Sequence, residues 1–492
     1  MVFARTSFFS RISPALIAAF LASVLLLLIP AIWNRFPFLF FDSGAYFERT
    51  FDGSLSAGRS MTYGAWLAYL RYPNFWPVVI AQSALSVWII YLMLRSHGLR
   101  ERPVALPVCL LAVSLFLTVA TALPWFAGQL MPDLFAGLAV LSLYLLLFKQ
   151  AALSRFERYG LIALIVFASA AHNATFAVMI ALTAAAGFFF VIHRKLLEAA
   201  GLKLAAVALV ASAVAVPSVN FIYSGQLAWT PGGSSFIFSR LVQDGIAQRY
   251  LADNCPDPTI KLCKFEKQMP KTADDFLWHQ GPKGPFVSIG GWVDGADEMR
   301  RITLDSLTMY PWMHVKTALS STGLQLVLVK SGDGLVREVW SAYEAIARLY
   351  PESNVAVNTS RQRFNLIQRT IDFMNTFHVP ITLGSMALLP LLLLLAWRRG
   401  HLTDMDKLAA TLILALLANA FVTGVLSNPH HRYGARVAWT APFFWSLFVM
   451  QILIVRREWQ ETALGWLASA RLLPKPATIE VRSKDESQAA KR

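Results

Sequence analysis

Long apolar runs, separated by shorter polar segments, occupy most of this 492-residue chain. Ten of them approach the roughly 20 apolar residues that an α-helix needs to cross the hydrocarbon core of a bilayer. They lie near residues 12–34, 76–94, 104–123, 130–148, 159–172, 174–192, 202–222, 377–397, 408–427 and 435–455. The runs lack the period-two alternation of strands, and a bilayer forces backbone polar groups to pair within the spanning segment. The pattern therefore predicts an all-α polytopic membrane protein with about ten transmembrane helices.

The spacing of the runs divides the chain into four parts. Residues 1–222 are predicted to form an N-terminal transmembrane module of seven helices, 223–376 a hydrophilic insert, 377–456 a C-terminal module of three helices, and 457–492 a polar tail. Apolar residues recur at helical spacing in the first polar loop, 35–75, which predicts two short juxtamembrane helices there. Prolines between residues 256 and 285 exclude long regular elements from the middle of the insert. We expect the insert to be a small, mostly helical cap.

Composition and charge agree with a membrane protein and indicate its orientation. Hydrophobic residues make up 56% of the chain and charged residues 15%, with a mean hydropathy of +0.50 and a net charge of +15. The basic excess mostly flanks the apolar runs on one side, whereas the charges of the insert nearly balance. Because loops rich in Lys and Arg stay in the cytoplasm, we expect both termini inside and the insert outside. The flanking cations fit an anionic lipid surface, and nucleic acid is not an expected partner.

The three cysteines add information about the compartment. Cys109 lies within an expected membrane helix, whereas Cys255 and Cys263 both lie in the insert. Disulfides persist in oxidising compartments, and no further ligands at zinc spacing stand near this pair. The sequence therefore predicts a Cys255–Cys263 disulfide that holds the cap together. With the orientation above, it indicates a multi-pass protein of a bacterial inner (plasma) membrane whose insert faces the periplasm.

Polar residues at the ends of the apolar runs give the strongest functional signal, because charge beside lipid is costly unless it has a function. Four such places exist, and the expected topology puts all four on the outer side. They are Asp42 after the first run, Asp133 at the start of the fourth, His172 and Asn173 between the fifth and sixth, and the segment SNPHHRYGAR at 427–436 with His430, His431, Arg432 and Arg436.

Each place also has a purely structural explanation. Asp42 and Asp133 suit the first turn of a helix, and the His172–Asn173 pair suits a helix end. The cationic segment is harder to explain in this way, because it opposes the positive-inside bias and because arginine is the preferred fork for phosphate. We therefore expect a bound anion there. Asp42, Asp133, His172 and Arg432 are predicted to meet in one cavity beneath the insert.

Two stretches of the first loop, FFDSGAY at 40–46 and GRSMTYGAWL at 58–67, resemble the GT-C membrane glycosyltransferases. These enzymes use polyprenyl-phosphate sugars and share seven membrane helices, juxtamembrane helices that begin with a functional Asp, and an outer insert after the seventh helix. The resemblance covers about residues 1–223 in layout. It implies that Asp42 is the catalytic base and that Asp133 is a second acidic residue. The Asp-x-Asp of metal-dependent members is absent, so we assign no metal ligand and leave a divalent metal open; no other cofactor is expected.

The expected function is transfer of a sugar from a polyprenyl-phosphate donor to a hydroxyl of an envelope glycan, lipid or protein. The leaving phosphate would be stabilised by Arg432, His430, His431 or Arg59. An O-antigen-ligase-like enzyme is an alternative, since it also uses outer His and Arg with a lipid pyrophosphate. A non-catalytic subunit for polysaccharide assembly or export is another. A transporter or flippase would carry charged or broken helices near the midplane, and the sequence shows almost none.

Overall fold

The fold is described from a computed structural model that covers residues 13–52, 59–99, 102, 104–194, 197–227, 229, 232–279 and 281–455. Among these residues the regular structure is helical throughout, and the one pairing between extended segments is an isolated bridge of Phe38 with Gln129. The predicted all-α class is therefore confirmed. The predicted cytoplasmic tail, 457–492, and the stretch 53–58 of the first loop lie outside the described residues.

Six helices are long and apolar enough to cross a bilayer, which makes the chain a multi-pass helical membrane protein. They are α1 (Pro14–Asn34), α4 (Trp76–Ser96), α9 (Asn173–Ile192), α10 (Ala199–Ser224), α18 (Gln368–Arg399) and α19 (Asp404–Val425). Their outward faces carry exposed apolar side chains at helical spacing, as Ile17, Leu21 and Leu25 do on α1. Such a surface is suited to lipid.

The other four expected spans are shorter or interrupted, so the count of ten is not confirmed. The helices α5 (Ala105–Ala120), α7 (Leu134–Phe148) and α8 (Arg155–Ala171) have 16, 15 and 17 residues. At 1.5 Å per residue, each falls short of a hydrocarbon core about 30 Å thick. The tenth run is broken into α20 (His431–Ala438), α21 (Thr440–Met450) and a π-helical turn, Gln451–Val455. A further short helix, α6 (Leu123–Ala127), starts at a proline-containing turn after α5.

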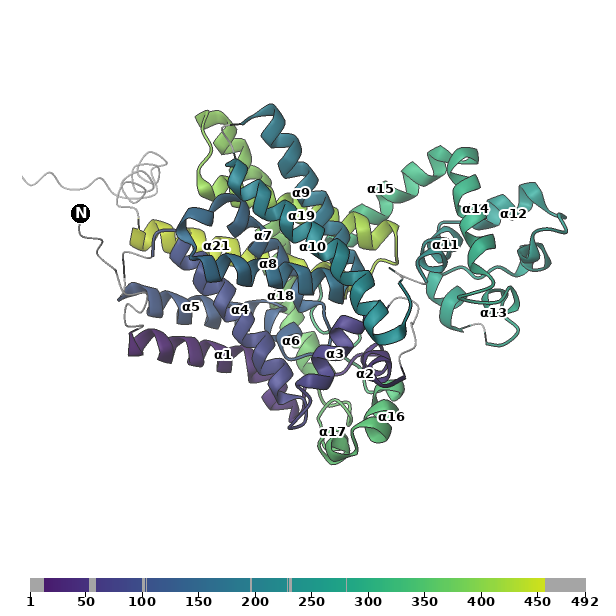
Figure 1. The fold of residues 1–492 in the computed structure, drawn as a ribbon, viewed down its shortest axis with the longest axis horizontal. Helices are drawn as coiled ribbons and strands as arrows, with labels where there is room; N and C mark the ends of the chain where they lie inside the picture. Colours follow the sequence, from purple (N-terminus) through teal and green to yellow (C-terminus); the bar gives the residue numbers. More distant parts are fainter. Residues whose placement is uncertain are drawn as a thin grey trace, which may run out of the picture.

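The helix α7 is the centre of the bundle, where it lies among the other helices in Figure 1. All of its residues from Leu134 to Leu147 are buried, and it packs against α4, α8, α10 and α19. A helix that is apolar on every side is stable only when it is covered on every side. The residue at its start is therefore held in a fixed position.

The first loop contains the two short helices that its pattern predicts, α2 (Ser43–Asp52) and α3 (Met61–Tyr69). The helix α2 begins directly after Asp42 and packs against α3 and against α16 of the insert. In Figure 1 the three helices lie together at one end of the bundle, which we call the insert face.

The insert consists of two parts rather than the single cap that we expected. The first part, residues 233–309, has a hydrophobic core of its own that includes Phe238, Leu251, Phe276 and Ile302. It contains α11 (Gly233–Gln243), α12 (Ile246–Asn254), η3 (Lys261–Gln268), η4 (Asp275–His279), α13 (Pro285–Ser288) and α14 (Ala296–Met309). Its disulfide, Cys255–Cys263, is confirmed.

The second part of the insert packs on the first loop and shares the core of the membrane bundle. The helix α15 (Pro311–Val327) returns along α19, and α16 (Trp340–Leu349), η5 (Pro351–Ser353) and α17 (Asn354–Asn358) follow. The side chain of Gln362 hydrogen-bonds the backbone of Leu39 in both directions, at 3.0 and 2.7 Å. Because α18 begins at Gln368, it runs through the predicted boundary at 376 without a break.

Candidate functional site

Two arginines on α20 form the centre of the site. Arg432 and Arg436 are four residues apart, so they lie on one face of the helix. The next residue after α20, Trp439, packs so closely on Gly137 of α7 that a Cβ at position 137 would approach its indole Nε1 to 2.6 Å. The same indole donates to the carbonyl of Arg436 at 3.0 Å. This packing holds the arginine face of α20 against the start of α7.

Asp133 lies at that start, and its side chain is fully buried. Its carboxylate oxygens are 3.7 Å from Nη1 of Arg432 and 3.6 Å from Nη1 of Arg436. The side chain makes no capping hydrogen bond to the backbone of α7. The structural explanation of Asp133 as a helix cap therefore does not account for the side chain, whose charge faces the arginines.

Asp42 forms the second carboxylate of the site. It forms an ion pair with Arg59, which follows the first-loop helix α2, and lies 3.5 Å from Nη1 of Arg432. Burial opposes ionisation here, but the charges of Arg59 and Arg432 outweigh it and hold the pKa of Asp42 below its ordinary value of 3.8. The guanidinium of Arg432 also lies 4.0 Å from the ring centre of Phe40, a cation–π contact that fixes its plane.

His172 and Asn173 lie where α8 ends and α9 begins. Nη1 of Arg436 is 3.3 Å from both ring nitrogens of His172, so the imidazole acts as the acceptor in this contact. Arg432 thus joins Asp42 to Asp133, and Arg436 joins Asp133 to His172, so the four residues lie together. We call Asp42, Arg59, Asp133, Arg432 and Arg436 the charge cluster.

Asn419 is a member of the site that the sequence analysis missed. Its side-chain oxygen accepts from Nε and Nη2 of Arg436 at 3.1 and 2.9 Å, and its amide donates to the carbonyl of Tyr433 at 2.7 Å. It is a buried amide in the otherwise apolar run of α19. That isolation within a membrane helix is the signal that would have identified it.

The two histidines of the segment 427–436 contact the insert instead of the charge cluster, which corrects their expected role in binding phosphate. Nε2 of His430 lies 3.6 Å from a carboxylate oxygen of Asp274. Nδ1 of His431 accepts from the backbone N–H of Lys330 at 3.2 Å. His430 is the N-cap of α20 and His431 its first residue, so their side chains point in other directions than the face that carries Arg432 and Arg436.

The charge cluster is buried. Among the described side chains it brings three guanidiniums together with two carboxylates. The half-exposed Asp333 lies beside the cluster, where its carboxylate accepts the backbone N–H of Arg432 at 2.9 Å. Guanidinium groups are strong, forked donors to phosphate oxygens, so a site that gathers three of them is suited to an added anion.

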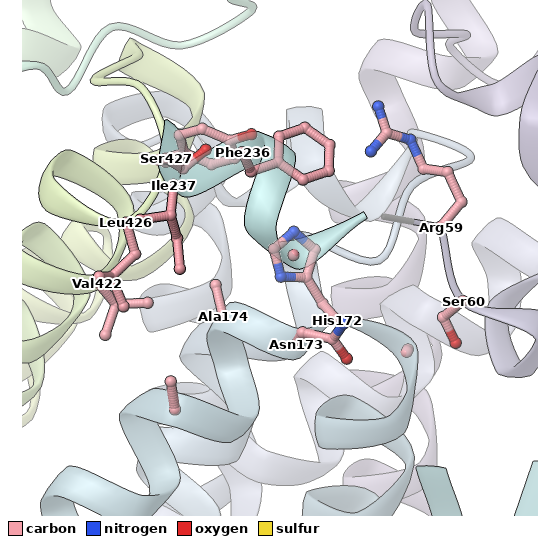
Figure 2. Close-up of a pocket in the computed structure, with 14 residues that line it drawn as sticks. Arg59, Ser60, His172, Asn173, Ala174, Phe236, Ile237, Val422, Leu426 and Ser427 are labelled. Atoms are coloured by element: carbon pink, nitrogen blue, oxygen red, sulfur yellow. The ribbon is translucent and has the colours of Figure 1, made fainter. Parts of the chain in front are cut away.

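A cavity of about 260 Å³ opens beside the cluster. One side of it is polar, with Arg59, His172 and Asn173, and another is apolar, with Ala174 and Ala177 of α9 and Val422 and Leu426 of α19. Figure 2 shows His172 in the middle of this pocket, with Phe236 of the insert above it, Arg59 to one side and Val422 and Leu426 to the other. The pocket is thus amphipathic and lies beneath α11.

No group of three or more His, Cys, Asp or Glu side chains is placed to hold a metal ion within the described ranges. Comparisons of the sequence with profiles of known protein families, with curated proteins and with solved structures find no match.

Proposed function

We propose that this protein is a membrane glycosyltransferase that moves a sugar from a polyprenyl-phosphate donor to an acceptor hydroxyl at the insert face. The observation that carries the proposal is the buried charge cluster, in which three arginines and two carboxylates meet beside an amphipathic pocket. The transfer reaction needs cations where the phosphate leaves and a carboxylate where the acceptor loses its proton.

The two sides of the pocket fit the two ends of such a donor. The phosphate would bind Arg59, which lines the pocket, and would reach Arg432, which lies behind it across Asp42. The polyprenyl chain would leave between α9 and α19 along Ala177 and Val422. Beyond the pocket the same two helices expose Ile180, Leu417 and Phe421, which would continue this path into lipid. A ligand with a charged head and a long apolar chain matches this change from polar to apolar lining.

In the proposed reaction, Asp42 is the general base. The acceptor oxygen attacks the anomeric carbon, its proton passes to the Asp42 carboxylate, and the bond from that carbon to the phosphate oxygen breaks. The electron pair of that bond leaves on the polyprenyl phosphate, where Arg59 and Arg432 stabilise the developing charge. Asp133 keeps Arg432 and Arg436 in place and does not touch the reacting atoms.

The same arginines explain how a carboxylate with a lowered pKa can act as a base. Without donor, Arg59 and Arg432 neutralise Asp42, which makes it a poor proton acceptor. A donor phosphate would compete for both guanidiniums, so the pKa of Asp42 would rise when the donor is bound. The base would then become active only with donor in the site, which limits wasteful reaction with water.

The proposal is tested with purified protein in lipid nanodiscs. We expect polyprenyl phosphate to bind more tightly than the uncharged polyprenol, and Arg432→Ala to remove this difference. With a panel of polyprenyl-phosphate hexoses, Asp42→Asn should lower turnover about 10²- to 10⁴-fold and leave donor binding largely intact. His431→Gln, next to Arg432 in sequence but outside the charge cluster, is the matched control and should change neither readout.

Two outcomes would contradict the proposal, and a third would replace it by a related one. Equal binding of the phosphate and the alcohol would show that the cluster does not recognise phosphate. Full turnover by Asp42→Asn would exclude the base and would favour a non-catalytic role in envelope assembly. Preferred turnover of a polyprenyl pyrophosphate over the monophosphate would favour the ligase-like alternative.

A further inference from the structure

A group of aromatic side chains on the insert continues from the pocket to the molecular surface. The ring centre of Phe236 lies 5.3 Å from that of Trp292 and 6.4 Å from that of Trp278, and the two indoles are 5.5 Å apart. The ring of Phe286 makes an edge contact with Trp292, with the two ring centres 4.9 Å apart. Trp278 is 49% exposed although it is one of the largest side chains of the insert. We call Phe236, Trp278 and Trp292 the aromatic platform.

The platform and the pocket share a wall. Phe236 lines the pocket opposite His172, and it also contacts both tryptophans of the platform. Figure 2 shows its ring at the pocket, directed over the site and away from the apolar side formed by Val422 and Leu426. A molecule that lies on the platform can therefore extend into the pocket without crossing the path that we assign to the polyprenyl chain.

Two aspartates lie close in sequence to the tryptophans of the platform. Asp274, four residues before Trp278, is partly exposed and accepts from the side-chain amide of Asn428 at 3.2 Å. Asp294, two residues after Trp292, is exposed and closes the turn at Gly290 and Gly291. Carboxylates near an aromatic surface can accept hydrogen bonds from hydroxyl groups, whereas a surface for a hydrocarbon chain would need none.

We propose that the aromatic platform binds the hexopyranose rings of an uncharged glycan, which is the acceptor of the transfer reaction. The assignment as acceptor rests on the proposed function; the binding itself does not. A pyranose ring has one face of C–H groups, which packs on an indole, and a rim of hydroxyls, which hydrogen-bond carboxylates and amides. Asp274 and Asp294, which are close in sequence to the two tryptophans, would disfavour uronic acids and other anionic sugars, because like charges repel.

The test uses the whole protein in nanodiscs without any donor. The probes are labelled hexasaccharides of glucose and mannose with α- and β-linkages, a hexa-uronate of matched length, and polyprenol. We expect at least one neutral hexasaccharide to bind and Trp278→Ala to weaken it about tenfold or more, which corresponds to roughly 1.4 kcal/mol. Trp278→Phe, which keeps a ring face, should recover part of the affinity.

The matched control is Trp397→Ala, which removes a tryptophan that is 77% exposed near the far end of α18 from the insert. It should leave glycan affinity unchanged. The proposal is overturned if no neutral hexasaccharide binds, if Trp278→Ala binds as well as the wild type, or if the uronate or polyprenol is the ligand that Trp278→Ala loses. Glycan binding without sugar transfer would support the platform and contradict the proposed function, so the two can fail separately.

Discussion

Neutralising Asp133 alone should be more damaging than neutralising Asp133 and Arg436 together. Both side chains are fully buried, and the nearest charged atoms are 3.6 Å apart. Arg436 also hydrogen-bonds Asn419, and Asp133 also faces Arg432 at 3.7 Å. The three variants needed are Asp133→Asn, Arg436→Gln and the double variant, all of which keep a polar side chain of similar shape.

The expected magnitude follows from the distance and the burial. At 3.6 Å and an effective dielectric constant of about 20, the pair attraction is on the order of 4 to 5 kcal/mol. Asp133→Asn leaves Arg436 buried without its carboxylate partner and should lower the free energy of unfolding by about 3 to 5 kcal/mol. Arg436→Gln leaves Asp133 paired with Arg432 at 3.7 Å and should lower it by about 1 to 3 kcal/mol. The double variant leaves no new unpaired charge, so its cost should be about 1 to 3 kcal/mol, mostly from the hydrogen bonds to Asn419. The coupling energy should therefore be about 3 kcal/mol or more.

The assay is denaturant unfolding in mild detergent, followed by near-ultraviolet circular dichroism. The control cycle replaces Asp297 and Arg300, an ion pair of 3.3 Å on the insert in which the aspartate side chain is 91% exposed. Its coupling should stay below about 0.5 kcal/mol, because solvent screens exposed pairs. If the Asp133–Arg436 effects add to within about 0.5 kcal/mol, the cluster is not electrostatically coupled and the reasoning fails.

Three further predictions concern packing, topology and pH. Gly137→Ala should displace the Trp439 indole and lower the free energy of unfolding by about 1 to 3 kcal/mol, measured in the same assay, whereas the equivalent change at the open Gly187 should not. Reporter fusions after residues 150 and 300 should report opposite sides of the membrane; the same side for both would refute the predicted topology. Because its pKa is lowered in the folded state, ionised Asp42 stabilises the protein above pH 3.8, and this contribution disappears as the pH falls through the lower folded pKa. The stability difference between wild type and Asp42→Asn should therefore shrink over that acidic range and stay constant at neutral pH.

The apolar runs predicted the helical class and the positions of most helices, because burial in lipid imposes a simple rule on sequence. They did not predict helix length within the bundle. The run near 435–455 reads as one span, yet α20 ends at Ala438 and α21 begins at Thr440, and Trp439 between them packs on Gly137. A hydrophobic pattern contains no information about such contacts between distant residues.

The site was predictable to the extent that charge near lipid is costly. That rule selected Asp42, Asp133, His172 and Arg432, which the structure brings together although they are up to 390 positions apart. It also selected His430 and His431, which contact the insert instead. Side chains of adjacent residues point in different directions. Which direction each one takes here depends on where α20 begins.

A network of buried ion pairs is by itself weak evidence for function, since such networks also fix the arrangement of helices. Two features separate the charge cluster from a network that only joins helices. Among the described side chains, its guanidiniums outnumber its carboxylates by three to two. Arg59 also lines the pocket, so part of the cationic charge faces a cavity. The phosphodiester that joins a polyprenyl chain to a sugar carries one negative charge, which Arg59 would meet at the point where the pocket changes from polar to apolar.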